Sequence, residues 1–250
     1  MCRSLLLTAA CAIASIQVAA AAEMPTKAPI YAPALYSWTG FYFGGQAGGG
    51  WFANQVTNGP NAADGTINFP PGFVHNPLNG SGWLAGGYAG FNYQVNQFVV
   101  GLDGDFSWAR LTGSTADIGP TGFNDVSNET IKWIATVTGR LGYAVNNWMF
   151  FGKAGWAWAG FSGTSATFNV AGVNTNNNTN SESRNGWTLG TGVEWGFAPH
   201  WSTKIEYDYV KFMTSNYNNT DTTVGGVVTF PGRSATSNLS MVKLGVAYRF

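Results

Sequence analysis

The sequence predicts an all-β fold, a transmembrane barrel of eight antiparallel strands in up-and-down order. Three observations lead to this prediction. Residues 238–250 alternate between apolar and polar or small side chains, which is the period of a strand with one apolar face. The connections between such segments are alternately short and long, as in outer-membrane barrels. The composition combines many aromatic residues with few charges, as expected when each strand faces lipid on one side and a polar lumen on the other.

The composition also argues against two common classes of protein. Only 10% of the residues are charged and 15% are aromatic, while mean hydropathy is near zero. A helical membrane protein would be far more hydrophobic, and a soluble domain would carry about a quarter charged residues. The 12 cationic and 12 acidic residues balance and form no basic patch, so we expect no nucleic-acid partner.

Residues 1–22 are predicted to be a cleaved signal peptide. Arg3 precedes an apolar stretch that is too short to span a bilayer, and small residues lead to a cleavage point after Ala22. Both cysteines lie in this segment, so the mature chain needs no disulfide. Lipidation of Cys11 is an alternative, which the residues before it fit poorly. The predicted parts are the signal peptide 1–22, an extended periplasmic leader 23–37 and the barrel 38–250.

Eight segments within the barrel region have strand character. Asn96-Gln97, residues 145–147 and Pro199-His200 form the short connections. Short turns are periplasmic and long loops are external in such barrels, so an even strand count places both ends of the barrel segment on the periplasmic side. The predicted strands are 39–52, 82–95, 98–111, 131–144, 148–161, 186–198, 201–213 and 238–250. The predicted long loops are 53–81, 112–130, 162–185 and 214–237.

Aromatic residues gather near both ends of the predicted strands, where tryptophan and tyrosine favour the lipid headgroup level. Ten residues separate Phe98 from Trp108. At ~3.3 Å per residue and ~40° of tilt, that distance corresponds to about 25 Å of membrane height. Strict alternation assigns Ile131 and Trp133 to the lipid-facing side of the fourth strand.

The opposite strand faces hold most of the charges of the chain. Charges removed from water need partners, and eight strands enclose a space that side chains can fill. We therefore expect a polar core held together by ion pairs, with a path for small solutes as the alternative. The predicted lumen residues are Asp103, Asp105, Lys132, Arg140, Lys153, Glu194, Lys204, Glu206, Asp208, Lys243 and Arg249. Arg140 is expected to pair with at least one acid across the lumen.

No enzymatic activity, cofactor or metal site is predicted. The chain has two histidines, too few for a histidine-rich metal site, and no glycine-rich phosphate loop with a lysine. A loop triad of His75, Asp64 and Ser81 is the one hydrolytic alternative, and polar loops contain these residue types by chance.

Several motifs together resemble one family. The motifs are residues 38–45 (WTGFYFGG), 138–143 (TGRLGY), 186–195 (GWTLGTGVEW), 204–209 (KIEYDY) and 246–250 (VAYRF). They resemble the RopB-like outer-membrane immunogenic proteins, also described as porin-family or opacity-type barrels, over essentially residues 22–250. The resemblance implies a Gram-negative outer-membrane barrel with surface-exposed loops. Lys153 departs from the small or neutral residue expected there. The haem binding ascribed to some members is not carried over, because no loop shows a ligand pair.

The expected function is a mainly structural role in the cell envelope, with passage of small solutes left open. The alternative is a surface binding module, an adhesin or a phage or ligand receptor of unknown ligand, that acts through the four long loops. The expected partners are outer-membrane lipid, lipopolysaccharide and the outer-membrane assembly machinery. The predicted assembly signal for that machinery consists of Val246, Tyr248 and Phe250.

Overall fold

A computed structural model describes residues 36–57, 72, 74–118, 124–169, 171–223 and 226–250. The predicted signal peptide and nearly all of the predicted leader lie outside these residues. Within the described part of the chain, no helix is long and apolar enough to cross a membrane. The strands are β1 (Gly40–Thr57), β2 (Leu78–Val95), β3 (Phe98–Ile118), β4 (Asn124–Val145), β5 (Trp148–Phe168), β6 (Asn174–Ala198), β7 (Trp201–Phe212), β8 (Ser215–Thr223) and β9 (Gly226–Arg249).

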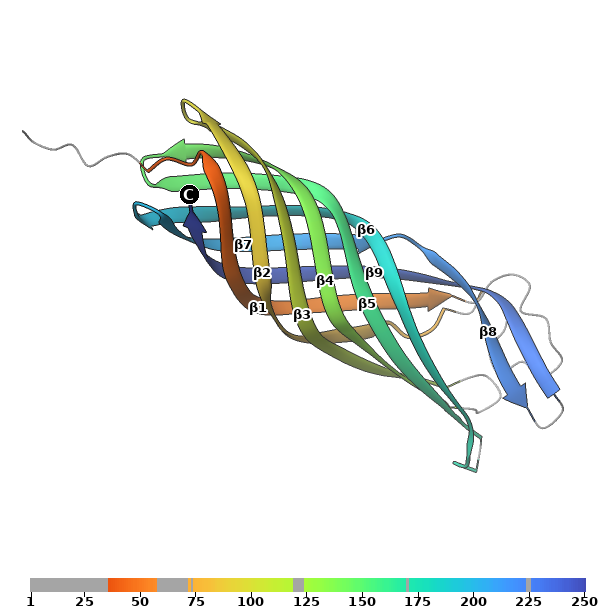
Figure 1. The fold of residues 1–250 in the computed structure, drawn as a ribbon. Coiled ribbons are helices and arrows are strands. Elements are labelled where there is room, and N and C mark those ends of the chain that lie inside the picture. Colours follow the sequence, from red (N-terminus) through yellow and green to blue (C-terminus); the bar gives the residue numbers. More distant parts are fainter. Residues whose placement is uncertain (1–35, 58–71, 73, 119–123, 170, 224–225) are drawn as a thin grey trace, which may run out of the picture. The chain divides into compact units, whose positions relative to one another are not determined.

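The strands form one antiparallel sheet that closes on itself (Figure 1). Each strand from β1 to β7 pairs with the next, β7 pairs with β9, and β9 pairs back with β1. β8 continues the line of β7 along β9, since Lys211 lies opposite Asn238 and Ser215 lies opposite Ala235. The ring therefore has eight positions, and the predicted eight-stranded up-and-down barrel is confirmed. Closure leaves no strand edge facing lipid, where backbone groups would lack hydrogen-bond partners.

The strand ends at the short turns lie within about a residue of their predicted positions, but the opposite ends do not. β3 continues to Ile118 and β4 begins at Asn124, so most of the predicted loop 112–130 is strand. The predicted loops 162–185 and 214–237 are likewise largely strand. These parts of the sequence are rich in serine, threonine and asparagine, so they lack the apolar alternation that revealed the membrane-spanning parts.

The outward face of the ring is apolar and bears aromatic contacts toward both strand ends. Near the short turns, the ring of Trp148 stacks on that of Trp195 with centroids 5.7 Å apart. Toward the other ends, Trp187 packs against Tyr209 at 5.8 Å. Between these levels lie exposed aliphatic side chains such as Leu141, which is 70% exposed. A surface of this kind is suited to lipid rather than to water.

The lumen is filled in layers that can be followed along the inward face of β3. Val99 belongs to an apolar cluster near the short turns, Asp103 and Asp105 lie among charges, and Leu111 belongs to a second apolar cluster. The first cluster, the inner apolar layer, contains Tyr36, Trp38, Val99, Ala144, Met149 and Phe151. The second, the outer apolar layer, contains Phe52, Leu78, Leu84, Leu111, Ile131, Ile134, Ala157, Ala159, Phe161, Val210, Phe212, Leu239 and Met241.

A bulge in β4 changes which of its residues face the lumen, so one part of the prediction is wrong. The pairing with β5 shifts between Ile131 and Trp133. Ile131 is buried in the outer apolar layer and Lys132 is exposed, so Lys132 is not a lumen residue and Ile131 does not face lipid. A bulge adds one residue to a strand and thereby reverses the face that the residues beyond it occupy. Strict alternation read from the sequence cannot reveal such an insertion.

Cysteine labelling tests this bulge, since the native cysteines lie in the predicted signal peptide. On intact cells, a membrane-impermeant maleimide should label Lys132→Cys and leave Ile131→Cys unmodified, because only the first side chain lies outside the barrel wall. Asn147→Cys, in the exposed turn at the opposite end, serves as the control and should react only after permeabilisation. Labelling of Ile131→Cys in place of Lys132→Cys would show that β4 runs without a bulge.

Candidate functional site in the barrel interior

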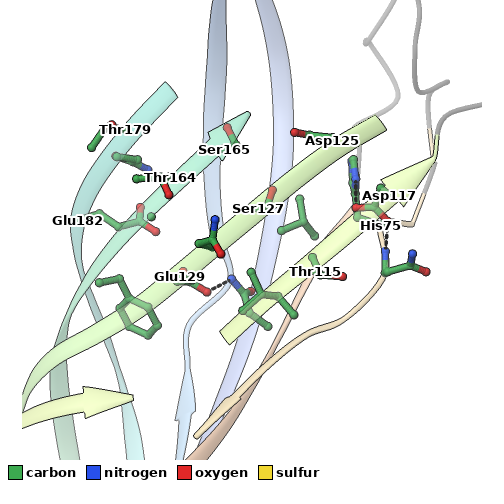
Figure 2. Close-up of a pocket in the computed structure, with 18 of the residues that line it drawn as sticks. His75, Thr115, Asp117, Asp125, Ser127, Glu129, Thr164, Ser165, Thr179 and Glu182 are labelled. Atoms are coloured by element: carbon green, nitrogen blue, oxygen red, sulfur yellow. Dashed lines mark hydrogen bonds and ion pairs between the residues drawn. The ribbon is translucent and has the colours of Figure 1, made fainter. Parts of the chain in front are cut away.

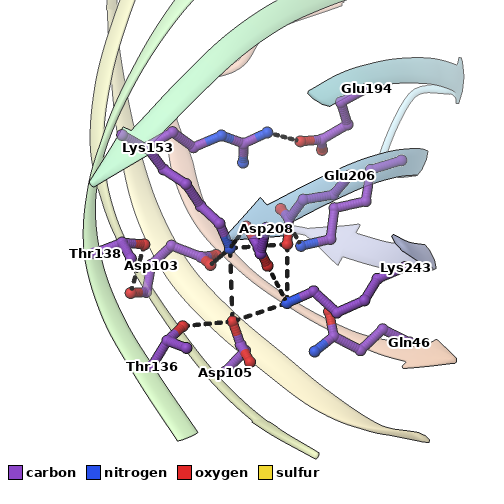
Figure 3. Close-up of polar contacts among 12 residues, drawn as sticks. Gln46, Asp103, Asp105, Thr136, Thr138, Lys153, Glu194, Glu206, Asp208 and Lys243 are labelled. Atoms are coloured by element: carbon purple, nitrogen blue, oxygen red, sulfur yellow. Dashed lines mark hydrogen bonds and ion pairs between the residues drawn. The ribbon is translucent and has the colours of Figure 1, made fainter. Parts of the chain in front are cut away.

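Ten of the predicted lumen residues lie buried inside the barrel, between the two apolar layers. Figure 3 shows the centre of this group, where Lys153 and Lys243 lie among acidic side chains. The ten residues comprise five cations and five carboxylates. The cations are Arg140, Lys153, Lys204, Lys243 and Arg249, and the carboxylates are Asp103, Asp105, Glu194, Glu206 and Asp208. Equal numbers of opposite charges suit a site that water reaches poorly, because a buried ion without a partner costs several kcal/mol or more.

Two lysine ammonium groups occupy the centre of this network. The Nζ atom of Lys243 lies 2.7 Å from Asp208, 3.0 Å from Glu206 and 3.2 Å from Asp105. Lys153 Nζ lies 2.8 Å from Glu206 and 3.3 Å from Asp208. The departure from the family pattern at Lys153 therefore adds a charge that the surrounding acids neutralise. A side chain at Gly190 would collide with the Lys153 stem, so the glycine makes room for it.

The same three acids are spaced closely enough to ligate a metal ion. Oxygen atoms of Asp105, Glu206 and Asp208 lie within 4.8 Å of one another. The ammonium groups of Lys153 and Lys243 lie among these oxygens (Figure 3). Lysine thus supplies the positive charge that a cation would otherwise bring, and the donor set fits an internal ion-pair brace better than a metal centre.

A second group of charges lies nearer the short turns. Arg140 contacts Glu194 and lies over the Phe151 ring, with the guanidinium carbon 3.7 Å from the ring centroid. The expected pairing of Arg140 with an acid across the lumen is confirmed. Arg249 approaches the same glutamate at 3.4 Å and donates a hydrogen bond of 2.7 Å to the Trp38 carbonyl.

The chain before β1 enters the lumen, which no pattern in the sequence indicates. Trp38 is fully buried, and its amide donates a 3.0 Å hydrogen bond to the Gln94 side chain. Tyr36 packs against it with ring centroids 4.5 Å apart. Tyr36 lies in the segment expected to be an extended leader, yet its ring is buried among the inner apolar layer. The two rings fill part of the lumen near the short turns.

Beyond the outer apolar layer the lumen opens into a polar cavity of about 470 Å³, the vestibule (Figure 2). It is built from β1 to β6, mostly from segments that the sequence suggested were loops. Arg184 links its charges: the guanidinium lies 3.0 Å from Glu129, pairs also with Glu182, and donates a 2.7 Å hydrogen bond to Ser237. Burial raises the pKa of the Glu129 carboxyl above its usual range, although Arg184 opposes that shift.

His75 also lines the vestibule, where its Nδ1 atom lies 3.1 Å from Asp117. The Asn76 amide donates a 2.7 Å hydrogen bond to the same carboxylate. Of the other two members of the alternative triad, Ser81 is exposed on β2 and Asp64 lies outside the described residues. The described residues therefore supply no support for that triad.

The residues of the predicted assembly signal lie on the outward face of β9. Phe250 is 69% exposed, and its ring lies 5.8 Å from that of Phe43. Tyr248 packs edge-on against Trp201 at 5.3 Å, and Val246 is also exposed. Their role in assembly stays a prediction.

Comparison with known proteins defines the class. The family described as outer membrane protein beta-barrel domain matches residues 7–250, so the chain belongs to that family. The chain is 29% identical to the 31 kDa outer-membrane immunogenic protein of Brucella melitensis biotype 1, over 96% of this chain and 93% of that protein. It is 27% identical to the 22 kDa outer membrane protein of Rhizobium leguminosarum bv. viciae, over 72% and 67%.

These relationships confirm the resemblance to outer-membrane immunogenic barrel proteins and place the chain in the Gram-negative outer membrane. Among solved structures, the outer membrane protease OmpT of Escherichia coli aligns with a TM-score of 0.52 at 9% identity, over 86% of this chain and 98% of that one. At that identity the likeness concerns the fold alone. The relatives are outer-membrane barrel proteins, and nothing in the comparisons points to catalysis in this chain.

Replacing Arg140 with methionine tests whether water screens the charges of the network. Because Glu194 would lose the guanidinium it contacts, we expect a loss of roughly 3–5 kcal/mol in the free energy of unfolding. Urea unfolding in lipid vesicles measures this. Arg110→Met, which removes an exposed guanidinium from β3, is the control and should cost about 1 kcal/mol or less. Equal, small effects would mean that water screens the network.

Proposed function

We propose that this protein is a closed barrel with a mainly structural role in the outer membrane, one that does not conduct solutes through its lumen. The apolar layers on either side of the charge network carry this proposal. Trp38 in the inner layer and Leu111 in the outer layer are both fully buried. A hydrated path would have to pass both layers, and the acids and cations between them are paired.

The charge network fits this role as a brace. Lys243 extends from β9 to acids on β3 and β7, so one side chain joins three wall positions. Lys153 joins β5 to β7 in the same way. Eight strands enclose about the space that side chains fill, whereas aqueous porin channels have about 16 strands. Cross-links of this kind hold the wall at a fixed radius.

Planar-bilayer recording tests the closed state. The wild-type protein should produce no conductance steps above the bare bilayer, because the apolar layers exclude water and ions. A double variant, Trp38→Gly with Leu111→Gly, removes one large side chain from each layer and should raise the conductance. Leu141→Gly, on the lipid-facing side, is the control and should stay silent. Reproducible steps from the wild-type protein would contradict the proposal.

A second candidate function is surface binding, favoured by the length of the strands. β6 pairs with β7 from Gly186 onward, and the Met213 amide also donates a hydrogen bond to the Asn185 carbonyl. In the described part of the chain, residues 176–184 pair with β5 on one side, and no strand pairing is described on their other side. Open edges can accept an added strand. In this proposal the binding surface lies on extended strands, whereas the sequence suggested long loops.

Surface binding can be tested by shortening the β5–β6 and β3–β4 hairpins. Each deletion joins two residues that lie opposite each other, so the remaining strand pairing is kept. Residues 163–180 can be replaced by a tight turn, because Ser162 lies opposite Ser181, and this removes most of the β6 edge. The control deletes 116–126, where Thr115 lies opposite Ser127. Both variants should keep the wild-type shift in gel mobility on boiling. Adhesion of expressing cells to cultured host cells should be lost with the β5–β6 deletion and kept with the control. Equal adhesion by both variants, or none by the wild type, would refute a site on this edge.

A further inference from the structure

Two cations on the outward face of the barrel wall have no role in either proposed function. Arg110 on β3 and Lys132 on β4 both have exposed side chains. Their chain neighbours Leu111 and Ile131 are buried in the outer apolar layer, so the two cations point to the opposite side of the wall. Among the described residues, neither cation forms an ion pair. An anion that neutralises them therefore has to come from outside this part of the chain.

An irregularity in strand pairing brings these two cations together. The pairing of β3 with β4 is regular up to Trp108 and Trp133, which lie opposite each other, and shifts just beyond them. Arg110 and Lys132 both lie in the shifted interval, and the bulge turns Lys132 outward, where strict alternation would place it in the lumen. Like charges on facing residues of neighbouring strands repel. An anion shared between the two side chains removes that repulsion.

The outward face offers these cations no acid among the side chains that the structure describes. The described side-chain carboxylates all lie in the lumen or line the vestibule. They are Asp103, Asp105, Asp117, Asp125, Glu129, Glu182, Glu194, Glu206 and Asp208. The wall thus separates charge, with these acids inside and the exposed cations outside. An outer surface of this kind attracts anionic headgroups.

Side chains of three kinds follow one another along this part of the wall. On the membrane side of the cations, the Phe106 ring packs against that of Trp108 with centroids 5.1 Å apart and stacks on that of Trp133 at 6.2 Å. Such rings gather where hydrocarbon meets the headgroups. On the outer side, Thr112 lies opposite Thr130, and their hydroxyl oxygens are 3.3 Å apart. The wall therefore presents aromatic rings, then cations, then hydroxyl groups in order toward the outside.

This order matches the parts of a phosphorylated glycolipid. Acyl chains pack on aromatic rings, and a guanidinium binds phosphate oxygens through two parallel N–H groups while an ammonium adds a second charge. Threonine hydroxyls both donate and accept hydrogen bonds, as sugar hydroxyls do. A glycerophospholipid supplies the acyl chains and the phosphate, but it has no sugar ring at the level of the threonines.

We propose that the outward face of β3 and β4 holds one phosphorylated glycolipid of the outer leaflet, the lipid anchor of lipopolysaccharide, with a phosphate between Arg110 and Lys132. The acyl chains lie along the rings of Phe106 and Trp108, and the sugar that bears the phosphate meets the threonine hydroxyls. The inference is independent of the closed-barrel role, because it concerns the outer surface of the wall and leaves the lumen unchanged.

Native mass spectrometry of the protein, folded in detergent and titrated with lipid A, tests the site. One lipid A that carries both phosphates should be retained, whereas lipid A without phosphates and phosphatidylglycerol should bind at least about tenfold more weakly. Arg110→Gln and Lys132→Gln should each weaken lipid A binding about tenfold, because each removes one charge-assisted contact with the phosphate. Lys132→Arg keeps the charge, so its affinity should stay within about twofold of wild type. A mobility shift on boiling shows that each variant is folded.

Lys211→Gln is the matched control. It also removes one outward cation, but from β7, where Lys211 lies opposite Trp187, so affinity should stay within about twofold. Binding that is absent, that is equally strong for phosphatidylglycerol or for lipid A without phosphates, or that falls equally with Lys211→Gln would overturn the proposal. Undiminished binding by either Arg110→Gln or Lys132→Gln would also overturn it, since the phosphate would then not be shared by the two cations.

Discussion

The structure depends on one constraint: the interior of an eight-stranded barrel is too narrow for bulk water and must be filled by side chains whose charges cancel. This chain meets the constraint with five cations and five carboxylates between two apolar layers. The ion pairs connect strands that are not neighbours in the wall, as Lys243 does between β9 and β3. Replacing one member therefore affects the far side of the ring as well as its own strand.

Much of this fold could be predicted from the sequence, because the membrane makes the two faces of each strand chemically different. Phe98, Val100 and Leu102 meet lipid while Asp103 and Asp105 face the lumen, and the period of two follows from that contrast. Beyond the membrane, both faces of β5 and β6 meet water. The contrast disappears there, so the pattern predicts loops where the structure has strands.

The candidate sites were predictable to different degrees for the same reason. The charged network lies within the membrane-spanning part, where alternation indicates which charges face inward. The vestibule residues, such as Glu129 and Arg184, lie in segments without a readable period. Trp38 begins the predicted barrel segment 38–250, but no periodicity in the sequence shows that a ring just before the first strand folds back into the lumen.

The extra residue at Lys132 has a consequence for how such a barrel can change over evolution. Inward positions on β4 are even-numbered from Ile134 toward the short turn and odd-numbered from Ile131 outward. If β4 alternated strictly through Lys132, Asp125 and Glu129 would point away from the vestibule, while Arg140 would keep its place. The bulge absorbs the extra residue, so removing Lys132 would remove the bulge and leave the residues on both sides of it on their present faces. At this point β4 can therefore gain or lose one residue without exchanging the lining of the outer mouth for its outward surface.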